Sequence, residues 1–329
     1  MRSIKAAFLA TTFLASTICV ASADVKVVAS IKPVHSLVFG VMQGIGKPAL
    51  LVEGAGSPHT YSLKPSQAKE LQAADVVFWM SHDLEAFLEN SIENIAKNAK
   101  SVSLMDSHGL TKLNFREGGA FDAHDHGDDD HDKHDDHDKH DDHDKHDGHA
   151  KHDDHGHGEH NPHFWLDPMN AKVMVREIRS QLSSIDPANA AQYESNAKET
   201  EARLDELMIE IEEELTGLQD SEFIAFHDAY QYFENRFGVK AVGTVTVSPE
   251  VMPGAKRLKE LREKVKSSKA TCVFSEPQFE PKIIEVITDG TGARTGVLDP
   301  LGAELKPGAD LYPTLIRQMA KAMKDCLSS

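Results

Sequence analysis

Histidine and aspartate gather in one stretch of the chain, from His124 to His163. This stretch holds 14 of the 19 histidines, interleaved with aspartate. It ends in the phrase Asn-Pro-His-Phe-Trp-Leu-Asp-Pro at residues 161–168. Imidazole and carboxylate groups are both metal ligands. The composition of the stretch therefore predicts that the protein works with a divalent transition metal.

The run itself has two interpretations. Residues 131–154 are four hexapeptides, HDKHDD, HDKHDD, HDKHDG and HAKHDD, with one alanine as the only hydrophobic residue. The insert 121–160 therefore cannot offset its ordering entropy, and we expect it to be disordered without metal. It is either a solvated charged loop or, as we favour, a set of weak auxiliary metal sites that collect, deliver or sense zinc. The histidines of these sites are His124, His126, His131, His134, His137, His140, His143, His146, His149, His152, His155, His157 and His160.

The acidic charge of the chain is concentrated in the same insert. Residues 121–160 contain 15 Asp, one Glu and four Lys, so they carry −12 of the formal net charge of −18. An acidic balance without a basic stripe argues against nucleic acid as a partner. It is compatible with the capture of cations.

The first 23 residues have the three features of a secretory signal peptide. Arg2 and Lys5 form a positive start, residues 6–20 are apolar but too short to span a bilayer, and an Ala-Ser-Ala sequence follows. We expect cleavage after Ala23 and a soluble, exported mature protein.

Two cysteines remain in the mature chain, Cys272 and Cys326. In an oxidising compartment an even pair favours a disulfide. A metal site with two cysteine ligands is the alternative, although no histidines cluster near either cysteine in the sequence.

From residue 24 onward, short β-branched runs alternate with longer helical stretches, which predicts parallel sheets built from βαβ units. The expected strands cover residues 25–30, 48–53, 75–80, 101–104, 223–227, 239–245, 271–275 and 294–298. The fold class is α/β, with two Rossmann-like lobes joined by one long helix. We expect an N-terminal lobe at 24–186 that carries the insert, a linking helix at 187–218 and a C-terminal lobe at 219–329.

Several potential ligands follow expected strand ends, where open parallel sheets bind their ligands. His59 follows the second strand, His227 ends a strand of the second lobe, and Glu276 and Asp299 follow two later strands. With His163 they could face one cleft between the lobes. Three imidazoles and an oxygen make a good zinc site, whereas manganese and magnesium sites favour carboxylates.

Spacing alone does not establish this metal site, because a lone histidine after a strand is more often a hydrogen-bonded loop residue. His35, His82 and His108 keep that interpretation. A zinc hydrolase would use the same ligands with a bound water and Glu276 as base, but the chain has no H-E-x-x-H motif. A zinc-storing or adhesive surface protein is a third class.

Six phrases along nearly the whole mature chain resemble the cluster A-I (cluster 9) metal-binding proteins of ABC importers, and within them the zinc-binding members. They are SIKP at 30–33, GAGSPHTYSLKPS at 54–66, NPHFWLDP at 161–168, FHDAY at 226–230, FSEPQF at 274–279 and LDPLG at 298–302. The resemblance implies two lobes, a rigid connecting helix and a metal held in the cleft between the lobes. It implies a non-enzymatic periplasmic protein that binds Zn²⁺ with high affinity and delivers it to a membrane permease.

The same resemblance implies that His59, His163 and His227 are the metal ligands. Manganese members have a carboxylate at the third position, so His227 indicates zinc; a manganese or broad-specificity protein is the alternative. Asp299 matches the carboxylate position of the family and is the expected fourth ligand, with water as the other candidate. The Glu that some zinc members carry before the first histidine is Pro58 here.

Further expectations follow from the resemblance. Glu276 is expected behind the ligands rather than on the metal, and Cys272 and Cys326 match a pair that is bridged in relatives. The insert matches a His-rich, acidic insert of zinc members. The expected partners are the permease subunit of an ABC importer and a periplasmic zinc chaperone, and the expected state is a monomer.

Overall fold

The structure is a computed structural model that describes residues 25–116 and 158–328, apart from 220, 247–248, 250, 252, 268–269 and 281. The expected signal peptide and all auxiliary histidines except His160 lie outside the described residues. Within those ranges, no helix combines the length and apolar character needed to cross a membrane.

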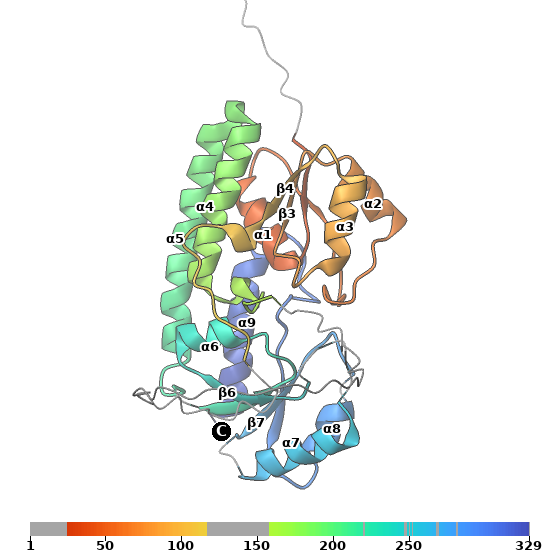
Figure 1. The fold of residues 1–329 in the computed structure, drawn as a ribbon. Helices are drawn as coiled ribbons and strands as arrows, with labels where there is room; N and C mark the ends of the chain where they lie inside the picture. Colours follow the sequence, from red (N-terminus) through yellow and green to blue (C-terminus); the bar gives the residue numbers. More distant parts are fainter. Residues whose placement is uncertain are drawn as a thin grey trace, which may run out of the picture.

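Two four-stranded parallel sheets form the centres of two lobes (Figure 1). The first sheet has the order β2-β1-β3-β4, with β1 at Val27–Ala29, β2 at Ala49–Leu50, β3 at Val76–Trp79 and β4 at Lys100–Ser103. The second has the order β6-β5-β7-β8, with β5 at Glu222–Ala225, β6 at Lys240–Thr244, β7 at Cys272–Ser275 and β8 at Arg294–Val297. All strand pairs are parallel, which confirms the predicted fold class.

Helices cover both sheets. In the first lobe they are α1 (Lys32–Val41), α2 (Pro65–Gln72), α3 (Ala86–Ile95) and α4 (Pro168–Ile185). In the second lobe they are α6 (Gln231–Phe237), α7 (Ala255–Ser267), α8 (Lys282–Thr288) and α9 (Leu311–Leu327). Short 3₁₀ turns lie at η1 (Leu104–Asp106), η2 (Phe164–Leu166) and η3 (Pro187–Asn189).

The long helix of the sequence prediction is α5, which covers Ala190–Glu214. It begins after the separate turn η3, so it is shorter than the expected range 187–218. Figure 1 shows α4 and α5 side by side along one side of the molecule. A second connection comes from α9, because the hydroxyl of Ser36 in α1 accepts from Tyr312 N at 2.9 Å.

One hydrophobic core is common to both lobes. It runs from Phe78 in the first sheet through Trp165 and Leu207 to Phe274 in the second sheet. A smaller cluster fills the other face of each sheet, under α2 and α3 in one lobe and under α7 and α8 in the other. Strands covered on both faces explain the nearly continuous apolar runs of the sequence. The shared core packs the lobes against one another.

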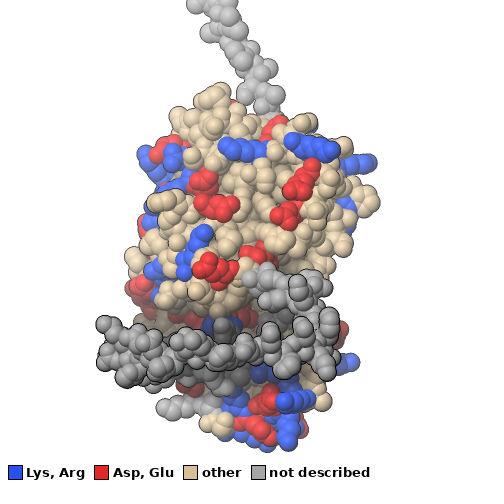
Figure 2. Space-filling view, viewed as in Figure 1, with Lys and Arg blue, Asp and Glu red and all other residues tan. Residues whose placement is uncertain are grey.

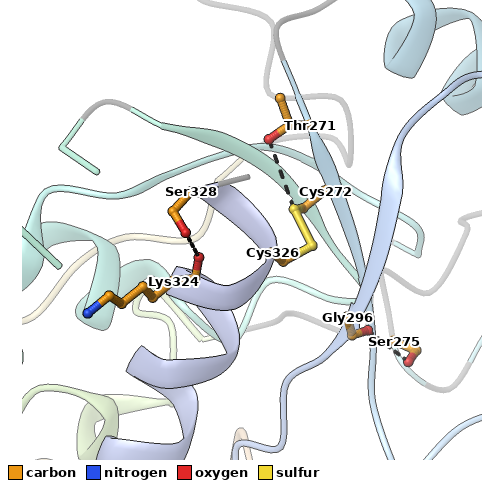
Figure 3. Close-up of a disulfide and its surroundings, with 7 residues drawn as sticks. All are labelled: Thr271, Cys272, Ser275, Gly296, Lys324, Cys326 and Ser328. Atoms are coloured by element: carbon orange, nitrogen blue, oxygen red, sulfur yellow. Dashed lines mark hydrogen bonds between the residues drawn. A yellow bond between two sulfur atoms is a disulfide. The ribbon is translucent and has the colours of Figure 1, made fainter. Parts of the chain in front are cut away.

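A disulfide joins Cys272 in β7 to Cys326 in α9 (Figure 3). It fastens the last helix to the central part of the second sheet. The predicted disulfide is confirmed, and the alternative of a metal site at these two cysteines is wrong.

Candidate metal centre

Three histidines from distant parts of the chain meet between the lobes. His59 lies in the loop between β2 and α2, His163 directly precedes η2, and His227 lies two residues beyond β5. One nitrogen from each ring lies within 4.8 Å of the others. Within the described ranges, no other group of three or more His, Cys, Asp or Glu side chains comes this close together.

The spacing of two of these nitrogens suits a tetrahedral metal. The Nε2 atoms of His163 and His227 are 3.3 Å apart. Zinc–nitrogen bonds of 2.0–2.1 Å at a tetrahedral angle separate two ligand atoms by about 3.3 Å. The ring centroid of His59 lies 5.5 Å from the ring centroid of His163 and 5.8 Å from that of His227.

The chain around His163 fixes the orientation of its ring. Asn161 Oδ1 accepts hydrogen bonds from His163 N at 3.1 Å and lies 2.7 Å from His163 Nδ1. The amide orientation of Asn161 is set by its Nδ2, which donates to the acceptors Asp228 O and Gln231 Oε1. Nδ1 of His163 therefore carries the proton, and Nε2 presents its lone pair to the metal position.

Glu276 has the same role for His227. Its Oε1 lies 2.8 Å from His227 Nδ1, and both side chains are buried. A carboxylate can only accept here, so Nε2 of His227 carries the lone pair that could bind a metal. Glu276 thus contacts the ring of His227 at Nδ1, on the side away from Nε2.

Burial favours the neutral form of His163. The residue is 4% exposed, and its pKa lies well below the ordinary value because of burial and, to a lesser degree, because of His227 and His59. Neutral imidazole is the form that binds metals. The site is therefore ready for a cation near neutral pH without losing a proton from this ring.

The space between the three rings is small. The cavity has a volume of about 10 Å³, and Pro58, Trp165, Phe279, Pro300 and Leu301 form its apolar walls. This volume corresponds to roughly one water molecule or ion. The arrangement can hold a single desolvated cation, and it has no room for an organic substrate.

Asp299 lies outside the group of three histidines. Its Oδ1 accepts from Gln278 Nε2 and its two carboxylate oxygens together accept from three backbone N–H groups, those of Leu301, Gly302 and Ala303. These bonds hold the turn that places Pro300 and Leu301 against the metal cavity. Lys32 holds the same turn from the first lobe, because its Nζ donates to Gly302 O at 2.9 Å.

The remaining sequence candidates lie elsewhere. His160 Nδ1 is 2.9 Å from Asn114 Oδ1 and is not part of the group of three histidines. His35 is buried in α1, where its Nε2 lies 3.1 Å from Pro48 O. The role of Asn161 was missed by the sequence analysis, although its place two residues before His163 was a usable signal.

Comparison with known proteins identifies the family of the chain. A family model described as zinc-uptake complex component A, periplasmic (ZnuA), matches residues 27–326. The chain belongs to the ZnuA family. The high-affinity zinc uptake system protein ZnuA of Brucella suis is 55% identical over 333 residues, which cover 100% of both chains. The ZnuA protein of Yersinia pestis is 35% identical over 327 residues, covering 98% of this chain and 99% of the relative.

Solved structures share the ZnuA architecture. A crystal structure of ZnuA aligns with a TM-score of 0.72 at 25% identity, covering 93% of this chain and 100% of the other. FpvC of Pseudomonas aeruginosa in complex with Mn²⁺ aligns with a TM-score of 0.74 at 18% identity, covering 93% of this chain and 99% of the other. The second likeness shows the fold alone. Because a Mn²⁺-bound protein also has this fold, the fold alone does not determine the metal, which must be argued from the ligands.

Proposed function

We propose that this protein is the periplasmic zinc-binding component of an ABC importer, and that it holds Zn²⁺ between its lobes with His59, His163 and His227. The observation that carries the proposal is the convergence of three imidazoles on one ion-sized cavity. Zn²⁺ is the cargo in this account. The names of the Brucella and Yersinia relatives, both zinc uptake system proteins, support the same assignment.

The ligand set favours zinc over manganese. All three members of the group are imidazoles, and manganese sites favour carboxylate and water ligands. For the fourth position we prefer water to Asp299, because the Asp299 carboxylate already accepts four N–H groups. A manganese or broad-specificity protein is the competing assignment.

The small cavity favours binding over catalysis. A hydrolase needs space for a substrate beside the metal and a base that can reach the attacking water. The cavity holds about 10 Å³, and Glu276, the available carboxylate, lies behind His227. We therefore assign a transport role without a catalytic step.

We place the mature protein in the periplasm after removal of residues 1–23, and its partners follow from that location. A membrane permease would receive the zinc, a periplasmic chaperone could supply it, and the protein would act as a monomer. Figure 2 shows positive and negative side chains intermixed on one face of the molecule.

The auxiliary histidines outside the described residues would act as a zinc collector or sensor. Deleting residues 121–157 should lower the number of bound zinc ions while the tightest site survives. Equilibrium dialysis at increasing zinc concentrations measures both quantities.

The central experiment is a competition titration against a zinc chelator. His59→Ala, His163→Ala and His227→Ala should each abolish or greatly weaken the tightest zinc site, and the wild type should prefer zinc to manganese. Acidification should weaken binding, because the ligand histidines must be neutral. Retention of the tight site in all three variants would refute the assignment.

A growth assay tests transport itself. A strain without this protein should grow poorly when zinc is scarce, and added zinc or the wild-type gene should restore growth. Normal growth of that strain in zinc-depleted medium would favour a storage or adhesive protein.

A further inference from the structure

The two chain segments that lead into and out of the insert form a paired base, which we call the insert root: residues 113–116 and 158–161. Asn114 and His160 form an antiparallel bridge across the root. The backbone N–H of Asn161 also donates across the root, to Leu113 O at 2.9 Å. The root is therefore a defined part of the fold beside the metal site.

The second segment of the root, residues 158–161, leads directly into the metal site. Asn161 orients His163 through its Oδ1, and its Nδ2 donates at 2.7 Å to the carbonyl oxygen of Asp228, the neighbour of His227. Its own carbonyl oxygen accepts from Tyr232 Oη at 2.8 Å. The root thus connects the segments that carry two of the three proposed ligands.

The first segment of the root, residues 113–116, ends in an arginine that reaches Asp228 beside His227. Arg116 donates to both oxygens of Asp228 from Nε, at 3.0 Å each. Its Nη1 and Nη2 donate to the two oxygens of Glu234 at 2.8 Å. Glu234 in turn accepts from Ala241 N at 3.0 Å, which ties α6 to β6.

The charges in this cluster depend on one another. The side chain of Arg116 is 21% exposed, and those of Asp228 and Glu234 are 13% and 8% exposed. Removing the guanidinium would leave two mostly buried carboxylates side by side, which would repel each other and move toward water. Because Asp228 follows His227 directly, its displacement would move a metal ligand.

We infer that Arg116 and the insert root position the metal site, holding the segments of His163 and His227 at the separation that zinc requires. The inference rests on the proposed function. Arg116 does not touch the metal position; it acts through Asp228, as partners behind a metal ligand do. Of the insert itself, tight zinc binding therefore needs the root residues 158–160 and not the histidine repeats.

Arginine variants test the role of the ion pair. Arg116→Gln should raise the Kd for zinc about 10-fold, at the lower end of the range for groups that orient metal ligands, because Arg116 acts through Asp228. Arg116→Lys should have an intermediate effect, because an ammonium keeps the charge but loses the planar fork. Asp228→Asn should also raise the Kd, and it serves as the test if Arg116→Gln does not fold.

Arg236→Gln is the matched control. It breaks the ion pair between the same helix, α6, and the buried Asp167, with contacts of 2.8 Å. It should lower the Tm of the apo protein and leave the Kd for zinc nearly unchanged. An equal rise in Kd for the two variants at an equal loss of Tm would overturn the inference, because Arg116 would then act on stability alone.

Two deletions that differ by three residues test the root itself. Removing 121–157 keeps the root segment with His160. Removing 121–160 takes away Gly158, Glu159 and His160. The first protein should bind its tightest zinc like the wild type, and the second about 10-fold more weakly. Equal affinities of the two deletion proteins would contradict the inference. Retention of tight zinc binding by His59→Ala, His163→Ala and His227→Ala would instead refute the proposed function, so the two failures can be told apart.

Discussion

Glu276 Oε1 lies 2.8 Å from Nδ1 of His227, at the side of the ring opposite to the metal position. Glu276 is 2% exposed and belongs to the loop after β7, whereas His227 follows β5. A carboxylate behind a histidine ligand fixes the tautomer and increases the basicity of the ring. It also brings a negative charge close to the proposed cation.

Replacing this carboxylate should weaken zinc binding in two steps. Glu276→Gln keeps an acceptor for Nδ1 but removes the charge, so the Kd should rise about 10-fold, whereas Glu276→Leu removes both and should cost up to about 100-fold. Chelator competition measures the change. Glu304→Gln, which neutralises an exposed carboxylate near the same loop, is the control. Equal affinities of wild type and Glu276→Leu would contradict this role.

Glu85 should make the stability of the protein depend on pH. Burial raises its pKa to about 7, although Ser30 and the backbone N–H groups of Ser81 and Met80 donate to it and oppose the shift. Between pH 4.5 and 7 the folded protein therefore holds a proton that the unfolded chain releases, and the free energy of unfolding falls as the pH rises through this window.

Glu85→Gln removes this titration while its amide can still serve the same partners. Relative to wild type, the variant should gain up to about 3 kcal/mol between pH 4.5 and pH 8, since one pKa unit corresponds to about 1.4 kcal/mol. Urea unfolding of the apo protein at both pH values measures the difference. A difference that stays constant with pH would show that Glu85 does not titrate in this range.

The disulfide should contribute strongly to stability. It closes a loop between residues 54 positions apart, for which the chain-entropy model gives about 4 kcal/mol. The double variant with Cys272→Ala and Cys326→Ala should lose a stability of this order in denaturant unfolding. Reduced wild-type protein should behave like the variant, and a loss below about 1 kcal/mol would contradict the model.

The shared core predicts little movement of the lobes. The hydrophobic cluster is continuous from Phe78 to Phe274, and both α5 and α9 pack across the junction. Zinc binding should therefore leave the small-angle scattering curve nearly unchanged. The protein without residues 121–157 is the best sample, because the repeats then do not contribute. A clear decrease in the radius of gyration on zinc addition would indicate domain closure instead.

The sequence predicts the elements of this fold well where the local pattern determines them. The apolar run at 75–80 becomes β3 at Val76–Trp79, and the Asp-Pro start at 167 becomes the N-terminus of α4, with Asp167 Oδ1 accepting from Met169 N. The strand expected at 48–53 is only Ala49–Leu50, although the backbone N–H groups of residues 51 and 52 still donate to the segment of β1. The extent of a strand depends on its neighbour, which a local pattern does not contain.

The same distinction between local sequence patterns and contacts with distant residues applies to the site. The phrases around the three histidines, which resemble those of a family, make these residues predictable, and the fold brings them together. The partners that orient them could not be read from spacing, since Asn161 reaches Asp228 across 67 residues and Glu276 reaches His227 across 49. The fourth ligand stays a prediction.

The order of the three histidines along the chain has a consequence for biosynthesis. His59 and His163 belong to the first half of the polypeptide, whereas His227 and its partner Glu276 are made later. A nascent chain that ends before β5 has two of the three proposed ligands and lacks Asp228, whose carbonyl oxygen accepts from Asn161 beside His163. The tightest of the proposed zinc sites therefore requires both lobes, so a product truncated before β5 should lack that site although it still carries the histidine-rich insert.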